Sequence, residues 1–252
     1  MGYIRFGWTA LGTFLMFVIS LPILLTAWLI GLFNMKGRDA ITMWVVRWSF
    51  KAVMVMAGVK AHISGYENIP KDKAVLYIGN HRSFFDVLSS YTLFPRMTSF
   101  IAKKQFEKVP MLSWWMKLLH NLFLDRDDIK QGLQTILTAI EYVKGGMSVV
   151  IFPEGTRNKT EEDILPFHEG SFKISTKTDC PIIPMTMYNM SAVFEDHFPQ
   201  LKPQHVFVDF GKPIIPSELE PEQRKHIGVY VRGIMLEKYD ELRKEHEKIV
   251  CR

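Results

Sequence analysis

The segment AVLYIGNHRSFFD, Ala74 to Asp86, decides the fold. It opens with a short apolar run that is typical of a buried strand, and a helix is expected to begin near Ser83, directly after that run. Similar short runs, rich in β-branched and aromatic residues, recur along the rest of the chain with helical stretches between them. This alternation predicts the α/β class, with a mixed central sheet flanked by helices.

The same two patterns predict the remaining elements. Strands are expected at residues 99–103, 122–125, 148–152, 182–187 and 205–210. Helices are expected near residues 106–120, 129–144 and 169–178, and a charged amphipathic helix is expected from Glu218 onward. No internal repeat or linker interrupts the series, so residues 59–252 are predicted to form one α/β domain.

The N-terminal stretch from Phe6 to Phe33 carries no charged residue. A helix rises about 1.5 Å per residue, so this stretch is long enough to cross a hydrocarbon core of roughly 30 Å. It is too long for the apolar region of a signal peptide. Pro22 is expected to kink it, which leaves a spanning and a re-entrant arrangement both open. Residues 1–58 are therefore predicted to be helices that anchor the chain in a membrane.

The segment from Ile41 to Val59 mixes tryptophan, valine and methionine with Arg47 and Lys51, which are spaced four residues apart. This pattern favours a helix at the membrane interface, and the alternative is an ordinary buried helix whose two cations reach solvent. More cations follow the apolar stretch than precede it, which places the rest of the chain on the cytoplasmic side of the cell membrane. The net charge of +5 is then explained by attraction to an anionic membrane surface, and nucleic acid is not expected as a partner.

His81 and Asp86 are the first candidate for chemistry. A histidine in a turn between strand and helix can fold back over an aspartate five residues later. The carboxylate would fix the tautomer of the imidazole and leave its other nitrogen as a base, which is what deprotonation of an alcohol requires. The alternative is that the two side chains form a hydrogen-bonded pair with a structural role only. No metal site is expected, because the neighbourhood offers no third ligand.

The second candidate is FPEGTR, Phe152 to Arg157, at the end of a predicted strand. Gly155 permits close approach of a ligand to the backbone, Thr156 supplies a hydroxyl, and Arg157 offers a planar fork suited to phosphate. Glu154 is expected to anchor Arg157 or to bind a substrate hydroxyl. A plain surface turn is the alternative.

Cations at two further strand ends are the third candidate. Lys103 and Lys104 follow one predicted strand, and Arg126 follows another. Together with Arg157 they are predicted to form a phosphate pocket, although each alone is typical of a solvated charge. The apolar stretch beside them, residues 111–123, is compatible with an acyl groove and equally with ordinary core packing.

In order along the chain, NHRSFFD, AKKQFEKVP with the downstream FLDR, FPEGTR and IIPM resemble the four sequence blocks of the glycerolipid acyltransferase family. The resemblance runs from about Gly58 to Lys212, keeps the order and spacing of the blocks, and is closest to the 1-acyl-glycerol-3-phosphate acyltransferase branch. The departures are small: His168 and Glu169 stand where relatives often carry basic residues. Asn158 replaces a frequent serine, which is expected to matter little.

The resemblance implies roles for the candidate residues. His81 and Asp86 would be the catalytic pair, and Glu154, Gly155 and Thr156 would shape the acceptor site. The acceptor phosphate would be faced by Lys103 or Lys104, Arg126 and Arg157. The block IIPM, residues 182–185, would have a structural or acyl-pocket role.

The implied reaction is acyl transfer to the sn-2 hydroxyl of 1-acyl-sn-glycerol-3-phosphate, which yields phosphatidic acid. The resemblance implies no cofactor, with acyl-CoA or acyl carrier protein as the acyl-bearing co-substrate. The expected partners are the lipid bilayer and lysophosphatidic acid. Two alternatives stay open: another lysolipid acceptor, and a non-catalytic membrane adaptor, which the intact His, Asp, Glu and Arg set disfavours.

Overall fold

The computed structural model describes residues 1–251, and Arg252, the last residue of the expected catalytic domain, lies outside the described residues. The helices are α1 (Gly2–Gly31), α2 (Met35–Ala57), α3 (Phe84–Leu93), α4 (Leu112–Leu118), α5 (Ile129–Lys144), α6 (Lys173–Thr178), α7 (Pro221–Lys225) and α8 (Ile227–Val250). The strands are β1 (Lys60–Ser64), β2 (Leu76–Gly79), β3 (Thr98–Lys103), β4 (Leu122–Leu124), β5 (Ser148–Ile151), β6 (Ile182–Tyr188) and β7 (His205–Phe210).

The seven strands form one mixed sheet in the order β1-β7-β6-β2-β5-β3-β4. Strands β6, β2, β5, β3 and β4 pair in parallel. Strand β7 runs antiparallel to β6, and β1 pairs in parallel with β7. The predicted mixed sheet flanked by helices is therefore confirmed. Every residue of β2 is buried because the strand lies in the middle of the sheet, with helices over both faces.

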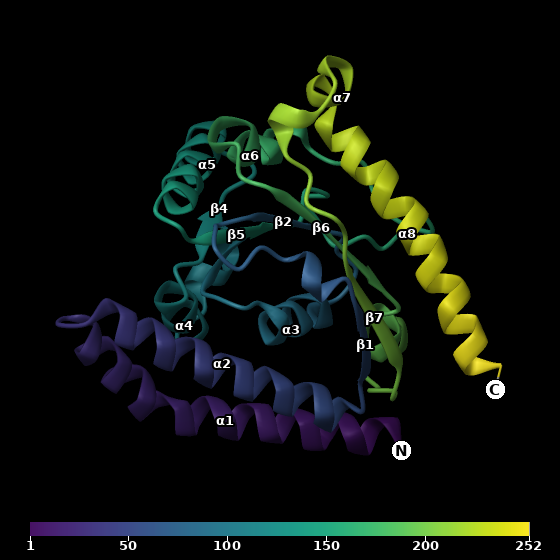
Figure 1. The fold of residues 1–252 in the computed structure, drawn as a ribbon. Helices are drawn as coiled ribbons and strands as arrows, with labels where there is room; N and C mark the ends of the chain where they lie inside the picture. The colour runs from purple at the N-terminus through teal and green to yellow at the C-terminus, as the bar shows by residue number, and fades with distance from the viewer. Residues whose placement is uncertain (252) are drawn as a thin grey trace.

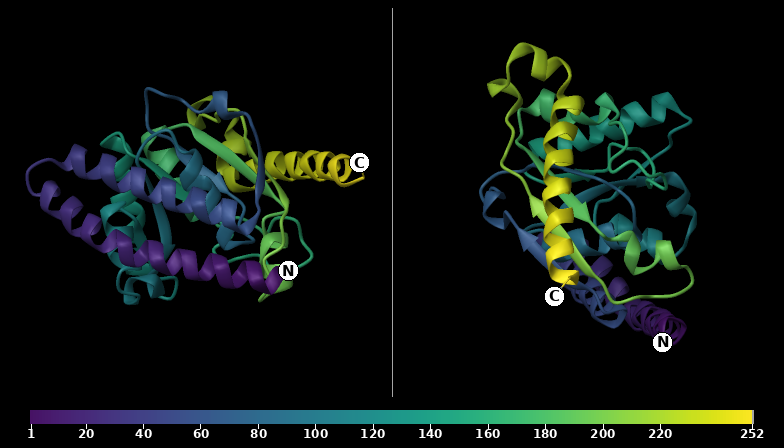
Figure 2. Two further views of the ribbon diagram at one scale, coloured as in Figure 1. Left: turned by 90° about the horizontal axis from the view of Figure 1, so that it is seen from below. Right: turned by 90° about the vertical axis from the view of Figure 1, so that its right-hand side faces the viewer.

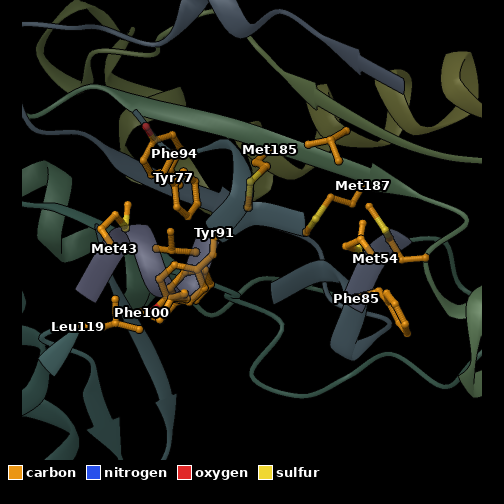
Figure 3. Packing of buried hydrophobic residues seen from close by; sticks show 14 of the residues in the cluster. Met43, Met54, Tyr77, Phe85, Tyr91, Phe94, Phe100, Leu119, Met185 and Met187 are labelled. Carbon is orange, nitrogen blue, oxygen red and sulfur yellow. The ribbon is translucent and has the colours of Figure 1, made fainter. Parts of the chain in front are cut away.

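Two hydrophobic clusters, one on each face of the sheet, hold the layers together. Val75 and Tyr77 contribute to the cluster beneath α2 and α3, and Leu76 and Ile78 contribute to the cluster beneath α5 and α8. Successive side chains of a strand point to opposite faces, so one short run serves both clusters. Figure 3 shows Met43 and Met54 of α2 among the sheet and α3 residues of the first cluster.

The first two helices form an antiparallel hairpin along the domain, with α2 between α1 and the sheet (Figures 1 and 2). The chain reverses at residues 32–34, where the Asn34 side chain accepts a hydrogen bond from Gly37 N at 2.9 Å and caps α2. Helix α1 continues through Pro22 without breaking, so the reversal lies at Asn34 and not at the proline as one expected arrangement required.

Both hairpin helices are long and apolar enough to cross a membrane by length and composition. Helix α1 leaves large apolar side chains exposed along its length, among them Trp8, Phe14 and Trp28. Helix α2 has two different faces, since it buries Met43 and Met54 but exposes Trp44 and Trp48. An exposed apolar surface of this kind favours association with a membrane.

The structure differs from the predicted elements in three details. The helix expected over residues 106–120 begins only at Leu112, because Pro110 ends a preceding turn of 3-10 helix, Lys104–Lys108. Strand β1 was missed, because it lies at the edge of the sheet and its sequence, KAHIS, has mostly exposed positions and no apolar run. The helix expected at residues 169–178 is a 3-10 turn followed by α6.

Candidate active site

The candidate residues lie at one edge of the sheet. Strands β2, β5, β3 and β4 are parallel neighbours in that order, so their carboxyl ends meet at the same edge. In sheets of this kind ligands bind outside the carboxyl ends of the strands. The loops that begin there carry His81 after β2, Glu154 to Arg157 after β5, Lys103 and Lys104 at the end of β3, and Arg126 after β4.

His81 and Asp86 meet in the turn between β2 and α3. His81 Nδ1 lies 2.8 Å from Asp86 Oδ2, and that oxygen also accepts the backbone N–H groups of Arg82 and Ser83, both at 2.7 Å. Asp86 is 1% exposed and lies in the first turn of α3, where the helix dipole favours a carboxylate. The carboxylate accepts a hydrogen bond from Nδ1–H of His81. The proton stays on Nδ1, which leaves Nε2 as the basic nitrogen.

Ser83 is the N-cap of α3, as the sequence indicated. Its hydroxyl accepts the Phe85 N–H at 2.9 Å, and Asp86 completes a capping box by accepting the Ser83 N–H. Asp86 therefore both caps the helix and orients His81. The structural and the catalytic interpretation of this aspartate are compatible.

Three contacts with residues 152–158, directly after β5, fix the position of His81. The imidazole stacks on Phe152, with ring centroids 4.3 Å apart. Its backbone N–H donates to Glu154 Oε1 at 2.6 Å, and its carbonyl accepts the Asn158 N–H at 2.7 Å. The preceding Asn80 exchanges two side-chain hydrogen bonds with the backbone of Met187, which ties the end of β2 to β6. Asp86 and Phe152 thus hold the imidazole, and the other contacts hold the backbone from which it projects.

Glu154 does not anchor Arg157, which was one of its two expected roles. It is 4% exposed, and its two oxygens accept the backbone N–H groups of His81 and Leu165, at 2.6 and 2.9 Å. The carboxylate near Arg157 belongs to Glu195 instead. Burial raises the pKa of Glu154 to about 7, and the two backbone hydrogen bonds oppose that shift. Glu154 holds together the two loops that flank the imidazole.

This buried carboxyl group predicts a pH-dependent stability. A pKa raised from 4.5 to about 7 means that the folded state binds more protons than the unfolded state between these values. The contribution to stability is therefore fully present below the unfolded pKa and is lost as the pH rises through 7. In the non-titrating variant Glu154→Gln, we expect a constant destabilisation from one lost acceptor.

The free energy of unfolding of the wild type, relative to that of Glu154→Gln, should therefore fall by on the order of 2 kcal/mol between pH 5 and pH 8. Denaturant unfolding at several pH values checks this result. A difference between the two proteins that stays constant with pH would show that Glu154 ionises normally.

The loop after β5 turns at Gly155, whose φ of 71° lies in the left-handed region. A Cβ added there would lie 3.0 Å from the His168 ring, so the position also requires a small residue. Thr156 is exposed, and Arg157 is partly buried with its guanidinium 4.1 Å above the ring of Phe84. The exposed hydroxyl and the stacked guanidinium are available to a ligand at the carboxyl edge.

Glu195 is a residue of the site that sequence reasoning missed. It follows β6, and its oxygens accept the Ser83 hydroxyl at 2.6 Å and the Phe84 N–H at 2.8 Å. The same carboxylate lies 3.5 Å from Arg157 Nη1. It thus joins the start of α3 to the loop after β5. No local signal identifies it, since its partners are more than thirty positions away in sequence.

The other predicted cations are present at the edge, but one of them is already paired. Lys104 Nζ lies 3.0 Å from Asp125 Oδ2, and Asp125 raises the pKa of Lys104. Lys103 is exposed, and partial burial lowers the pKa of the Arg126 guanidinium. The interpretation of these residues as free phosphate ligands was therefore incomplete, because it did not include the acidic partners of Lys104 and Arg157.

The loop after Arg157 is more ordered than its sequence suggested. Asn158 is 3% exposed, donates to the Glu162 carbonyl at 2.6 Å and accepts the Thr160 N–H at 2.9 Å. The Asn158 amide therefore has a structural role in this turn. Arg82 also donates to the carbonyls of Thr160 and Glu162, both at 2.8 Å.

Glu169 has a structural partner outside the site. Its carboxylate accepts the Gly228 N–H at the start of α8. At a position where relatives often carry a basic residue, Glu169 thus ties its loop to the start of α8.

Residues 60–188, slightly more than half of the chain, match the family model described as Acyltransferase. The chain belongs to the acyltransferase family. Membership makes it an enzyme and sets aside the adaptor alternative. The matched range covers β1 to β6 and contains every predicted site residue.

Named relatives agree with this assignment. The chain is 30% identical to the 1-acyl-sn-glycerol-3-phosphate acyltransferase of Saccharomyces cerevisiae, over 82% of this chain and 69% of that protein. It is 33% identical to the protein of the same name from Borreliella burgdorferi, over 60% of each. The crystal structure of the 1-acyl-sn-glycerophosphate acyltransferase from Thermotoga maritima superimposes with a TM-score of 0.80 at 23% identity. It covers 96% of this chain and 98% of that one, so the whole fold, hairpin included, is shared.

Proposed function

We propose that this acyltransferase transfers a fatty acyl group from a thioester to the sn-2 hydroxyl of 1-acyl-sn-glycerol-3-phosphate, giving phosphatidic acid. The observation that carries the proposal is the oriented His81 imidazole, with Nε2 free, at the sheet edge that also presents Arg157. The names of the yeast and Borreliella relatives support this choice of acceptor.

The reaction needs two proton transfers, one from the acceptor hydroxyl to His81 and one from His81 to the leaving thiolate. The acceptor hydroxyl loses its proton to Nε2 of His81 while its oxygen bonds to the thioester carbonyl carbon. The carbon–sulfur bond then breaks, and the leaving thiolate takes the proton from the imidazolium. Asp86 stabilises the imidazolium in between. A thioester is an activated donor, so orientation and a base suffice and no covalent enzyme intermediate is required.

The acceptor phosphate is assigned to the cations of the carboxyl edge. Arg157 has five N–H donors in a planar fork, and its contact with Glu195 uses only part of them. Lys104, with Lys103 beside it, and Arg126 lie at the ends of the two strands beyond β5. Binding of the phosphate by these cations places the acceptor hydroxyl near His81. Gly155 and Thr156 line the path by which the acceptor reaches it. Either acyl-CoA or acyl carrier protein is compatible with the site as donor, and no cofactor enters the steps above.

Membrane attachment is assigned to the hairpin of α1 and α2. Because α2 packs on α3 and α4 along its length, the hairpin lies against the catalytic domain and does not project from it. We infer that α1 lies within one leaflet, with the catalytic domain on the cytoplasmic surface. Such an arrangement would bring the carboxyl edge close to lysolipids in the same leaflet.

The acceptor is tested directly with the purified full-length protein in mixed vesicles. We expect high activity with 1-acyl-glycerol-3-phosphate, and at least about tenfold lower kcat/KM with glycerol-3-phosphate and lysophosphatidylcholine, because neither offers both the acyl chain and a terminal phosphate. Each acceptor is measured with acyl-CoA and with acyl carrier protein thioester, which identifies the donor. Equal activity with lysophosphatidylcholine would contradict the assignment of the acceptor phosphate to these cations and favour another lysolipid acceptor.

A further inference from the structure

A groove of about 680 Å³ opens between α2 and the loops at the edge of the sheet opposite to the candidate active site. Its walls include Tyr66, which follows β1, and residues 95–97, which precede β3. Because β1 runs opposite to β2, both segments lie at the amino ends of β2 and β3, whereas the catalytic loops lie at the carboxyl ends. The groove is therefore separate from the site of chemistry.

The groove is positively charged. Arg47 and Lys51 line it from α2, and Arg96 lines it from the loop before β3. Within residues 1–251 the ion pairs of the structure include none of these three cations. The one acidic residue in the lining, Asp39, is already neutralised by Arg38 at 2.6 Å. The balance of charge in the groove fits an anion.

One buried polar atom at the groove, Nε of Arg47, has no hydrogen-bond partner among the described residues. Buried polar groups normally have partners. The protein therefore does not use the full hydrogen-bonding capacity of the Arg47 guanidinium, and an anion in the groove would offer it an acceptor.

The rim of the groove is suited to a lipid. Trp44 and Trp48 line it on successive turns of α2 and are 65% and 59% exposed. Exposed indoles favour the level of the headgroups at a membrane surface. Helix α1, which packs along α2, also exposes large apolar side chains. A cationic groove with an indole rim on a membrane-associated hairpin matches a phosphate headgroup on top of acyl chains.

We propose that this groove binds the phosphate headgroup of an anionic glycerophospholipid of the bilayer, at a site distinct from the catalytic one. Arg47 and Arg96 contact the phosphate from opposite walls, and Lys51 adds charge. Trp44 and Trp48 pack on the glycerol and the upper acyl chains. A bound lipid would fix the position of the domain relative to the bilayer surface.

The test separates a phosphate site from diffuse attraction to a charged membrane. Binding of the full-length protein is measured by flotation with vesicles that contain phosphatidylglycerol, and with vesicles of equal charge that contain cholesteryl hemisuccinate, which has no phosphate. We expect the wild type to bind the first kind about tenfold more tightly, which corresponds to ~1.4 kcal/mol. Arg47→Gln and Arg96→Gln should each remove most of this preference, and Lys51→Gln should weaken it.

The matched control is Lys71→Gln, which removes the same charge from an exposed lysine next to Arg96 but outside the groove. This variant should keep the preference, and so should Arg157→Ala, which alters only the candidate active site. The proposal is overturned if Lys71→Gln loses the preference as Arg96→Gln does, or if Arg157→Ala abolishes it. It is also overturned if inorganic phosphate at constant ionic strength displaces the vesicles, because the groove would then bind the free anion.

Thermal unfolding of each variant identifies a folding defect. Lys51 is exposed, so Lys51→Gln tests the groove without disturbing the core. An unchanged phosphatidylglycerol preference in a folded Lys51→Gln and a folded Arg47→Gln would end the proposal.

Discussion

Replacement of His81 by alanine is expected to reduce kcat by about 10²–10⁴-fold, the usual cost of a lost general base. The KM for the acceptor should change little, because the phosphate contacts lie on other loops. The backbone of residue 81 keeps its hydrogen bonds with Glu154 and Asn158, so the fold of the turn is retained. Steady-state kinetics with acyl thioester and lysophosphatidic acid measure both parameters. Near-normal turnover in this variant would place the base elsewhere.

Asp86→Asn separates orientation from charge. In the wild type a single oxygen, Oδ2, accepts from His81, Arg82 and Ser83. The two backbone donors should hold the amide oxygen of the asparagine at the same place, so His81 keeps an acceptor and loses only the negative charge. We therefore expect a smaller loss of kcat than in His81→Ala. The double variant should be scarcely slower than His81→Ala alone, since both residues serve one proton transfer. Losses that multiply would contradict the dyad.

The sequence predicted the dyad because its parts are local. β2, the N-cap Ser83 and the first turn of α3 lie within one short segment, and capping alone brings Asp86 back toward His81. The sheet was predictable for a similar reason, since each central strand is an apolar run that is buried on both faces. Strand β1 has no such run, because an edge strand needs fewer buried side chains.

The partners of the cations were not predictable in this way. Glu195 is far from Ser83 and Arg157 in sequence and meets them only because β6 ends beside β2. Asp125 pairs with Lys104 because β4 lies next to β3. The burial of Glu154 also depends on two loops closing over it. Residue types indicated an anion site, and only the topology shows which charges are already compensated.

The ion pair of Arg157 with Glu195 leads to the second large effect. Arg157→Ala is expected to lower kcat/KM for the phosphorylated acceptor by roughly ten- to a hundredfold, because a charge-assisted contact contributes about 1.5–3 kcal/mol. The KM for the acyl thioester should stay the same. Lys104→Ala should have a smaller effect of the same kind, since Lys104 is more exposed and shares its charge with Asp125.

Glu195→Gln is the matched control, because it removes the charge that opposes Arg157 and keeps a side chain able to bond Ser83 and Phe84. A partly exposed ion pair contributes about 0.2–1 kcal/mol, so releasing Arg157 should lower the acceptor KM by a factor between about 1.4 and 5. The two variants thus shift the acceptor response in opposite directions if substrate phosphate and Glu195 compete for one guanidinium. An acceptor KM that rises equally in both variants would instead mean that the pair is a structural tie between α3 and the loop after β5. In that case the phosphate would have to be bound by Lys104 and Arg126 on the far strands of the sheet.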